Sequence, residues 1–203
     1  MAIITDIENA RGRVIVRADG AEIARLSARH FDKCPLNVGD EIDPEQWIGR
    51  VAAAQFADAW EAALSSLDLC ARTAKALRDA LRRKGYVDPA VDATIERLKA
   101  AGFIDDARYA RRMAELQAAK PVGVHALRRK LMARGIAEQD AEAALAAFDD
   151  DQQRAACRQA AEGLWHKYEA LPRREARAKL SQALARRGFG WDCIESVVDD
   201  IAD

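Results

Sequence analysis

A helical unit that recurs three times along the chain constrains the fold more than any other feature of the sequence. The fragments LRRKGY (81–86), LMARGI (131–136) and LARRGF (184–189) contain glycines that lie 50 and 53 residues apart. A leucine stands four and eight residues before each glycine, and apolar residues follow it at the sixth, tenth and thirteenth positions. These steps keep one apolar face on each of two helices. A glycine between two helices fits a helix end that needs a positive φ.

Proline-containing segments divide this pattern into tandem repeats. A third helix is expected after the pair in the first two repeats, beginning near Asp105 and Asp150. Residues 120–123 and 171–174 then separate the repeats, because proline breaks a helix or starts the next one. The expected repeats are 71–120, 121–171 and 172–203. The last would be incomplete, and the predicted fold class is mainly α: tandem three-helix, helix-turn-helix-like repeats in an elongated array.

Acidic residues mark the starts of several predicted helices. Asp88 precedes Pro89, a pattern typical of an N-cap followed by proline at the first helical position. Asp192 can cap the matching helix of the last repeat. The pair Asp105 and Asp106 is compatible with metal binding or acid–base chemistry, but a helix cap explains it better, since negative charge favours a helix N-terminus.

Residues 1–43 have the pattern of a small β unit. Two β-rich runs, RVIVRA and AEIARLSA, flank the dipeptide Asp19-Gly20, which favours a tight hairpin turn. The segment CPLNVGDEI (34–42) adds a candidate third strand with a turn inside it. The expected unit is therefore a β-hairpin or a three-stranded sheet.

One helix over residues 44–70 is expected to link this β unit to the repeats. Asp43 and Pro44 match an N-cap followed by proline at the first helical position. From there, apolar residues recur every three or four positions and share one helical face. They are Trp47, Val51, Ala54, Ala57, Trp60, Leu64 and Leu67.

Composition places the chain among soluble globular proteins. Half of its 203 residues are hydrophobic and 32% are charged, with a net charge of −1, so a disordered chain is excluded. The N-terminus does not resemble a signal peptide, and the apolar runs are too short to span a membrane. The four cysteines form no CxxC motif or Cys/His cluster, so we expect a cytoplasmic protein without structural zinc or another cofactor.

The motifs of common enzyme classes are absent from the sequence. It has no P-loop, no glycine-rich dinucleotide fingerprint and no HExxH zinc motif. The histidines His30, His125 and His166 are scattered, so each is expected to be a surface or hydrogen-bonded structural residue. We therefore expect a protein without catalytic activity.

Lysine and arginine gather in three clusters before the repeat glycines. A cation at a helix C-terminus favours the helix dipole by roughly 0.3–1 kcal/mol, which explains Lys84, Arg134 and Arg187. Earlier cations repel one another unless a polyanion, an acidic protein groove or acids of a neighbouring helix balance them. These earlier cations are Arg78, Arg82, Arg83, Arg128, Arg129, Lys130, Arg173, Arg174, Arg177, Lys179 and Arg186.

The residues disfavour two modes of nucleic-acid recognition. A sequence-reading helix-turn-helix needs base-reading side chains on an exposed helix, whereas the corresponding helix of the first repeat carries Asp92 and Glu96. Stacking on single-stranded bases needs exposed aromatic rings. Tyr86 and Phe189 alternate with Ile136 at matching positions, which indicates packing instead. The other aromatic residues expected to be packed are Trp165, Tyr168 and Trp191.

The repeat region resembles the RecX family. The similarity covers about residues 60–203, so the β unit would be a variable N-terminal extension. The resemblance implies three tandem three-helix repeats, and hence one more helix in the last repeat than the proline pattern places. The likeness is carried by Arg72-Thr73, LRRKGY (81–86), GFIDDARYA (102–110), GVHALRRKLMARGI (123–136) and ALARRGF (183–189).

This resemblance implies a non-enzymatic regulator of the RecA recombinase in recombination, DNA repair and the SOS response. Such proteins bind in the groove of the RecA–DNA filament and limit its extension, ATP hydrolysis and strand exchange. We expect a monomer whose partners are the RecA filament and, more weakly, single-stranded DNA, with no membrane. The alternatives are a stand-alone nonspecific DNA-binding protein and a scaffold for another helical protein. The candidate binding residues are Arg78, Arg82, Arg83, Arg128, Arg129, Lys130, Arg173, Arg174, Arg177 and Arg186.

Overall fold

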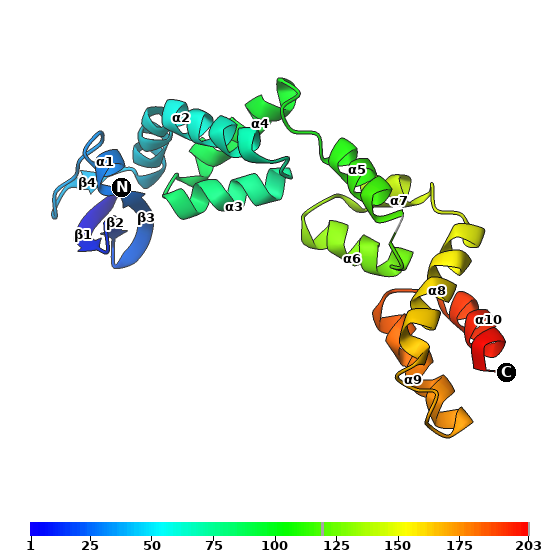
Figure 1. Cartoon of the computed structure of the whole chain (residues 1–203). Helices are drawn as coiled ribbons and strands as arrows, with labels where there is room; N and C mark the ends of the chain where they lie inside the picture. Colours follow the sequence, from blue (N-terminus) through cyan, green and yellow to red (C-terminus); the bar gives the residue numbers. More distant parts are fainter. Residues whose placement is uncertain (119, 203) are drawn as a thin grey trace. The chain divides into compact units, whose positions relative to one another are not determined.

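The computed structural model describes residues 1–118 and 120–202, which fall into two compact units, Met1–Asp105 and Asp106–Asp203 (Figure 1). The first unit contains β1 (Ala2–Ala10), β2 (Arg13–Ala18), β3 (Ala21–Ser27), α1 (Ala28–Phe31), β4 (Glu41–Ile42), α2 (Pro44–Leu69), α3 (Ala74–Lys84) and α4 (Asp88–Ala100). The second contains α5 (Asp106–Ala118), α6 (Val124–Ala133), α7 (Glu138–Leu145), α8 (Asp150–Trp165), α9 (Arg173–Arg186) and α10 (Trp191–Ala202). The chain is mainly helical, as predicted, and none of the described helices is long and apolar enough to cross a membrane.

The N-terminal residues form an antiparallel sheet with the strand order β3-β2-β1-β4. The predicted hairpin is confirmed, because Ala18 pairs with Ala21 across a two-residue turn. Both turn residues, Asp19 and Gly20, have positive φ, which matches the right-handed twist of the strands that they join.

The expected small β unit is confirmed, but its sheet has four strands where a hairpin or three strands were expected. β1 is the additional strand, and acidic residues interrupt its apolar alternation. Asp6 and Glu8 contact Arg17 of β2, with carboxylate–guanidinium distances of 2.5 and 3.1 Å. These cross-strand ion pairs accommodate polar residues that a plain hydrophobic pattern does not assign to a strand.

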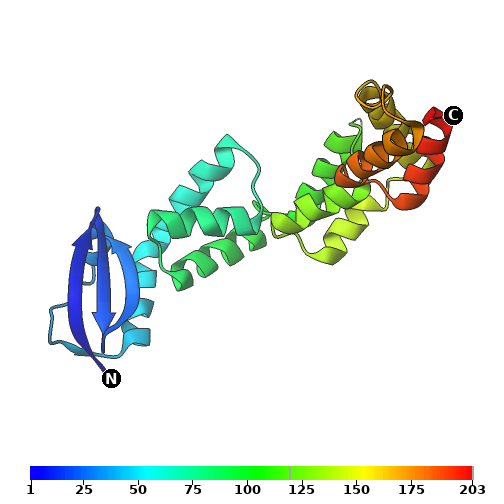
Figure 2. The same cartoon turned by 90° about the horizontal axis from the view of Figure 1, so that it is seen from below.

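Helix α2 is shared between the sheet and the first group of helices, so it is more than a link. The Asp43 carboxylate accepts hydrogen bonds from two amides of the first turn, which confirms the predicted N-cap. Trp47 and Val51 are buried against the sheet, where Figure 2 shows the start of the helix. Further along, Ala63 is buried in a separate core with α3 and α4.

Three separate cores define three three-helix domains, named here the first (α2–α4), second (α5–α7) and third (α8–α10) domains. The expected repeats 71–120, 121–171 and 172–203 are shifted by one helix, because the additional helix precedes each pair instead of following it. The third domain therefore has all three helices. The elongated array stays a prediction. Buried core residues include Leu77, Leu81 and Ile95 in the first domain, Leu127, Leu131 and Leu145 in the second, and Leu180, Leu184 and Ile194 in the third.

Left-handed glycine turns join the second and third helices of every domain, as predicted. The φ angles of Gly85, Gly135 and Gly188 are 89°, 81° and 86°. In the first domain, the amide of Gly85 donates to the carbonyl of Arg82 at 2.9 Å. Such a turn closes the helix on itself and sends the chain back along the hairpin.

The predicted N-caps of two third helices are displaced from their expected residues. Val87 is the N-cap of α4, so Asp88 is the first helical residue. Helix α10 begins at Trp191, and Asp192 lies in its first turn. Asp106 likewise opens α5. These carboxylates lie at the positive end of the helix dipole, which favours acidic residues in the first turn of a helix.

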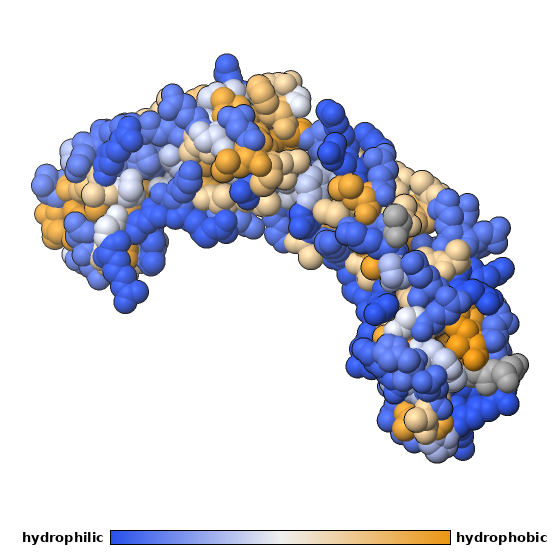
Figure 3. Space-filling model, viewed as in Figure 1, coloured by the Kyte–Doolittle hydropathy of each residue, from blue (hydrophilic) through white to orange (hydrophobic). Residues whose placement is uncertain are grey.

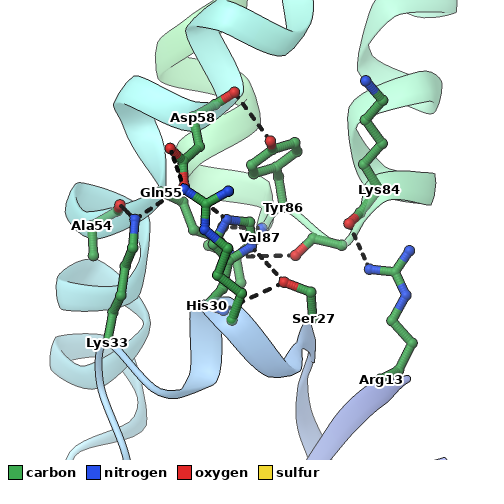
Figure 4. A network of polar contacts seen from close by, with 12 residues as sticks. Arg13, Ser27, His30, Lys33, Ala54, Gln55, Asp58, Lys84, Tyr86 and Val87 are labelled. Atoms are coloured by element: carbon green, nitrogen blue, oxygen red, sulfur yellow. Dashed lines mark hydrogen bonds and ion pairs between the residues drawn. The ribbon is translucent and has the colours of Figure 1, made fainter. Parts of the chain in front are cut away.

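A buried glutamine ties the glycine turn of the first domain to α2 (Figure 4). Gln55 has no exposed surface; its Nε2 donates to the carbonyl of Gly85 at 3.1 Å, and its Oε1 accepts from the amide of Val87 at 2.8 Å. From β2, the guanidinium of Arg13 donates to the carbonyl of Lys84 at 2.6 Å. The sheet and α2 thus satisfy the last carbonyls of α3, which a helix end leaves unpaired.

Next to this turn, His30 connects α1 to α2 (Figure 4). Its Nε2 lies 3.2 Å from Oδ2 of Asp58, and its Nδ1 lies 3.0 Å from Oγ of Ser27. The ring of Tyr86 packs at a centroid distance of 5.1 Å, and its hydroxyl donates to the carbonyl of Asp58 at 3.0 Å. Only 6% of His30 is exposed.

Burial favours the neutral form of His30, and the neighbouring donors and cations favour an ionised Asp58. Burial lowers the pKa of His30, and this effect outweighs the opposite influence of Asp58. The hydrogen bond from Lys33 is the main cause that lowers the pKa of Asp58, and His30 and Arg29 act in the same direction. Protonation of either group therefore favours the unfolded chain, so acid destabilises this contact.

We predict that Gln55→Met destabilises the first unit by about 1–3 kcal/mol, because the buried amide of Val87 and carbonyl of Gly85 lose their partners while side-chain volume is kept. Chemical denaturation of the full chain measures the effect. Gln159→Met on the exposed face of α8 is the matched control and should change stability little. Equal stability of the two variants would contradict the structural role of Gln55.

We predict that the melting temperature falls as the pH is lowered from 7.5 to 5.5. Since the folded state lowers the pKa of His30, the unfolded chain binds this proton more readily, and stability is lost below the ordinary histidine value of about 6.5. Thermal melts of His30→Gln should show a flatter pH profile. His166→Gln, which changes an exposed histidine, should keep the original slope. An unchanged slope in His30→Gln would refute this assignment.

Candidate functional site

The predicted basic residues lie on the second helices of the three domains, α3, α6 and α9, and several face acids on the third helix of the same domain. Arg78 Nε lies 3.0 Å from Oδ1 of Asp92, and Arg128 Nη2 lies 3.5 Å from Oε1 of Glu142. In both pairs, the arginine lies seven residues before the glycine of its domain, and the acid lies seven residues after it. The same ion pair thus closes the helical hairpin in the first and second domains.

Two further pairs follow the same arrangement. Arg82 Nε donates to Oδ1 of Asp88 at 2.7 Å, and this hydrogen bond raises the pKa of the guanidinium. In the third domain, Arg177 pairs with Asp199. Acids of a neighbouring helix therefore account for four of the ten candidate residues, one of the explanations that the sequence left open. Exposed ion pairs contribute little stability, but they reduce the charge that these four arginines offer to a partner.

The remaining candidates are exposed on α3, α6 and α9. Arg186 is exposed, and its Nε donates at 3.3 Å to the carbonyl of Gln182 in its own helix. Arg173 is exposed at the start of α9. Besides Arg186, four exposed candidates form no ion pair within residues 1–118 and 120–202. They are Arg83, Arg129, Lys130 and Arg174.

An additional arginine that the sequence did not indicate joins the end of α3. The guanidinium of Arg13 donates to the carbonyls of both Arg83 and Lys84, so three cationic side chains come from one small region. A guanidinium at these carbonyls also meets the negative end of the α3 dipole. Arg13 lies 70 residues before Arg83, in a strand, and no local pattern could have connected them.

In the second unit, the end of α9 meets the start of α6. The amide of Gly123 donates to the carbonyl of Arg187 at 3.1 Å, and the amide of His125 donates to that of Gly188 at 3.1 Å. Arg186 immediately precedes this contact, and Arg129 follows it by one turn of α6. Exposed cations of the second and third domains therefore lie close to one backbone contact between these domains, which is called the joint below.

On the face drawn in Figure 3, hydrophilic residues cover much of the surface, as expected for a chain rich in charged residues. The packing predicted for Tyr86, Ile136 and Phe189 is confirmed, because each contributes to its domain's core. Trp165 and Tyr168 also pack against the third core. The prediction for Trp191 is wrong: 59% of it is exposed, because it is the first residue of α10 and lies outside the third core.

One polar cluster is connected like the serine, histidine and aspartate of a catalytic triad, but its residues have a structural role. Ser27, His30 and Asp58 form a hydrogen-bonded chain. However, the Ser27 hydroxyl caps α1 by accepting the amide of His30, and the ring of Tyr86 packs against the buried imidazole. Over the residues that the structure describes, no group of histidine, cysteine or acidic side chains could hold a metal ion.

A small sheet followed by three helical domains with basic second helices defines a modular, mainly helical protein. Models of the RecX three-helix domains match the chain in order: the first over residues 59–98, the second over 105–145 and the third over 150–198. These matches begin in or directly before α2, α5 and α8, in agreement with the packing of the domains.

Full-length comparisons agree with the domain matches. Regulatory protein RecX of Levilactobacillus brevis is 30% identical over 95% of this chain and 73% of its own. That of Streptococcus mutans is 28% identical over 98% and 76%. A crystal structure of regulatory protein RecX superposes with a TM-score of 0.69 at 25% identity, covering 98% of this chain and all of the other. The chain belongs to the RecX family, whose members are regulatory proteins without enzymatic activity.

We predict that Arg128→Glu destabilises the second domain, whereas Arg129→Glu does not. The first change places a carboxylate against Glu142 and removes an ion pair, at a cost of up to about 1 kcal/mol for an exposed pair. The second changes an exposed side chain without an ion pair in the described part of the chain. Thermal unfolding monitored by circular dichroism separates them. Equal melting temperatures would show that the Arg128–Glu142 pair does not stabilise the hairpin.

Proposed function

We propose that this chain binds the RecA–DNA filament and inhibits RecA, limiting filament extension, ATP hydrolysis and strand exchange. Its RecX membership supports a role in regulating the RecA recombinase, and thereby in recombination, DNA repair and the SOS response in the bacterial cytoplasm. The proposed action needs no catalytic group and no cofactor, because occupying the filament is sufficient to block it. We propose a monomer as the acting form.

The observation that carries the proposal is the set of exposed cations that the domains do not need for their own folding. Arg83, Arg129, Lys130 and Arg174 lie on second helices, and no acid among the described residues pairs with them. Like charges held together repel one another until an anion binds. DNA phosphates, or an acidic groove of a filament, would relieve this repulsion and release bound counterions.

The charges of the third helices favour nonspecific contacts with DNA phosphates over recognition of a base sequence. A helix in the major groove presents donors or cations to base edges. Here the third helices expose Asp92, Glu142 and Asp199, whose carboxylates are occupied by arginines of the second helices. Acidic helices would be repelled by phosphates, so the second helices are the better binding surface.

A stand-alone DNA-binding protein is the alternative, and the same exposed cations would also suit it. The two functions differ in the amount of protein that inhibition requires. A filament inhibitor acts at concentrations too low to coat free DNA, whereas a stand-alone binder inhibits only in proportion to the DNA that it covers. Inhibition of the DNA-dependent ATP hydrolysis of RecA, titrated at fixed DNA, distinguishes them.

We predict that the double variant Arg129→Glu/Lys130→Glu inhibits this ATP hydrolysis at least about tenfold more weakly. If both side chains contact phosphates of single-stranded DNA, the slope of log affinity against log salt should fall by about 1.4, since each contact contributes about 0.7. Titrations at several salt concentrations measure both quantities. Wild-type binding that does not respond to salt would contradict the electrostatic part of the proposal.

The double variant Arg50→Glu/Lys167→Glu is the matched control, because it makes the same change in net charge at exposed cations outside the candidate set. It should inhibit nearly as well as the wild type. An equal loss in both double variants would show that only net charge matters. No loss in Arg129→Glu/Lys130→Glu would remove these two residues from the site.

A further inference from the structure

The first turn of α6 is capped by another domain. Three successive amides at this helix start donate to the third domain: Gly123 to the carbonyl of Arg187 at 3.1 Å, Val124 to Oε1 of Gln153 at 3.0 Å, and His125 to the carbonyl of Gly188 at 3.1 Å. The first amides of a helix have no partner within the helix, and Gly123 has no side chain to cap them. The third domain supplies all three acceptors.

Two glycines make this contact possible. A Cβ atom on Gly123 would lie less than 3.0 Å from backbone atoms of Gly188, and one on Gly188 would lie equally close to the backbone of Ala126. Real Cβ atoms essentially never come that close, and backbone atoms cannot rotate away. Gly188 also has positive φ, whereas Gly123 has φ −77° and ψ 152°, which any residue adopts. Gly123 is therefore required for space alone.

The glutamine in this contact is itself held in place. The thiol of Cys193, on α10, donates to the backbone carbonyl of Gln153 at 3.6 Å. Helices α8, α9 and α10 thus all take part in fixing the start of α6. Two of the three bonds join backbone to backbone, and such bonds cannot shift as a contact between side chains alone can.

We propose that Gly123 and Gly188 are positioning residues that present the cations of α6 and α9 as one rigid surface. This inference rests on the proposed function. In it, the joint fixes the distance between two groups of cations. The first group is Arg129 and Lys130 on α6, and the second is Arg174 and Arg186 on α9. A filament offers acidic groups at fixed intervals. A surface with matching fixed spacing binds without the cost of ordering two independent domains.

The test compares Gly123→Ala with Gly163→Ala in the full chain. Gly163 lies inside α8 with nothing within 4 Å of an added Cβ, so it is the matched control. We expect Gly123→Ala to speed hydrogen exchange at the amides of residues 124–126, while the core amides of α9 and α10 stay protected. Filament affinity should fall at least about tenfold, whereas affinity for an oligonucleotide short enough to contact one domain should not change. Gly163→Ala should leave all three readouts unchanged.

Each outcome is decisive. Unchanged exchange in Gly123→Ala refutes the joint, and faster exchange with unchanged filament affinity refutes its positioning role. If Gly123→Ala unfolds the second unit, Gln153→Ala replaces it, because that change removes only the acceptor of the Val124 amide. Absence of filament binding by the wild type would instead refute the proposed function, while the exchange data would still report on the joint.

Discussion

The structure depends on a left-handed glycine turn whose helix-end carbonyls are satisfied by a neighbouring element. In the first domain, Arg13 of β2 and Gln55 of α2 bind the carbonyls around Gly85. In the third domain, amides from the start of α6 bind those around Gly188. Because a buried carbonyl without a partner is costly, each turn fixes the position of the element that caps it. In the first and third domains, the glycine turn is therefore a joint as well as a hairpin turn.

This constraint explains the distribution of charge. Cations before each glycine favour the helix dipole, and arginines further back bind acids across the hairpin, as Arg78 binds Asp92 and Arg128 binds Glu142. The hairpin thus uses part of the basic cluster for its own stability. Side chains such as Arg129 and Arg174 are left over, and they are the ones available to a polyanion.

The limits of the sequence patterns are visible in particular residues. The glycine spacing and the Asp43 N-cap were read correctly, because each is a local feature of the backbone. The grouping of helices was wrong by one, because amphipathic periodicity shows that a face is buried and not which neighbour buries it. Gln55 was not recognised, since a polar residue inside a helix resembles a surface position until its two partners, 30 and 32 residues away, are known.

The sequence by itself determined the three hairpins, their glycine turns and the family resemblance, because these depend on contacts within about 20 residues or on residue order alone. Only the tertiary structure decided which arginines are paired, which aromatic ring is exposed and where the domains meet. Trp191 and Arg13 show the reason: their environments depend on packing between distant segments. Such contacts produce no repeating pattern in the sequence, because each involves only one or two residues from each of the two segments.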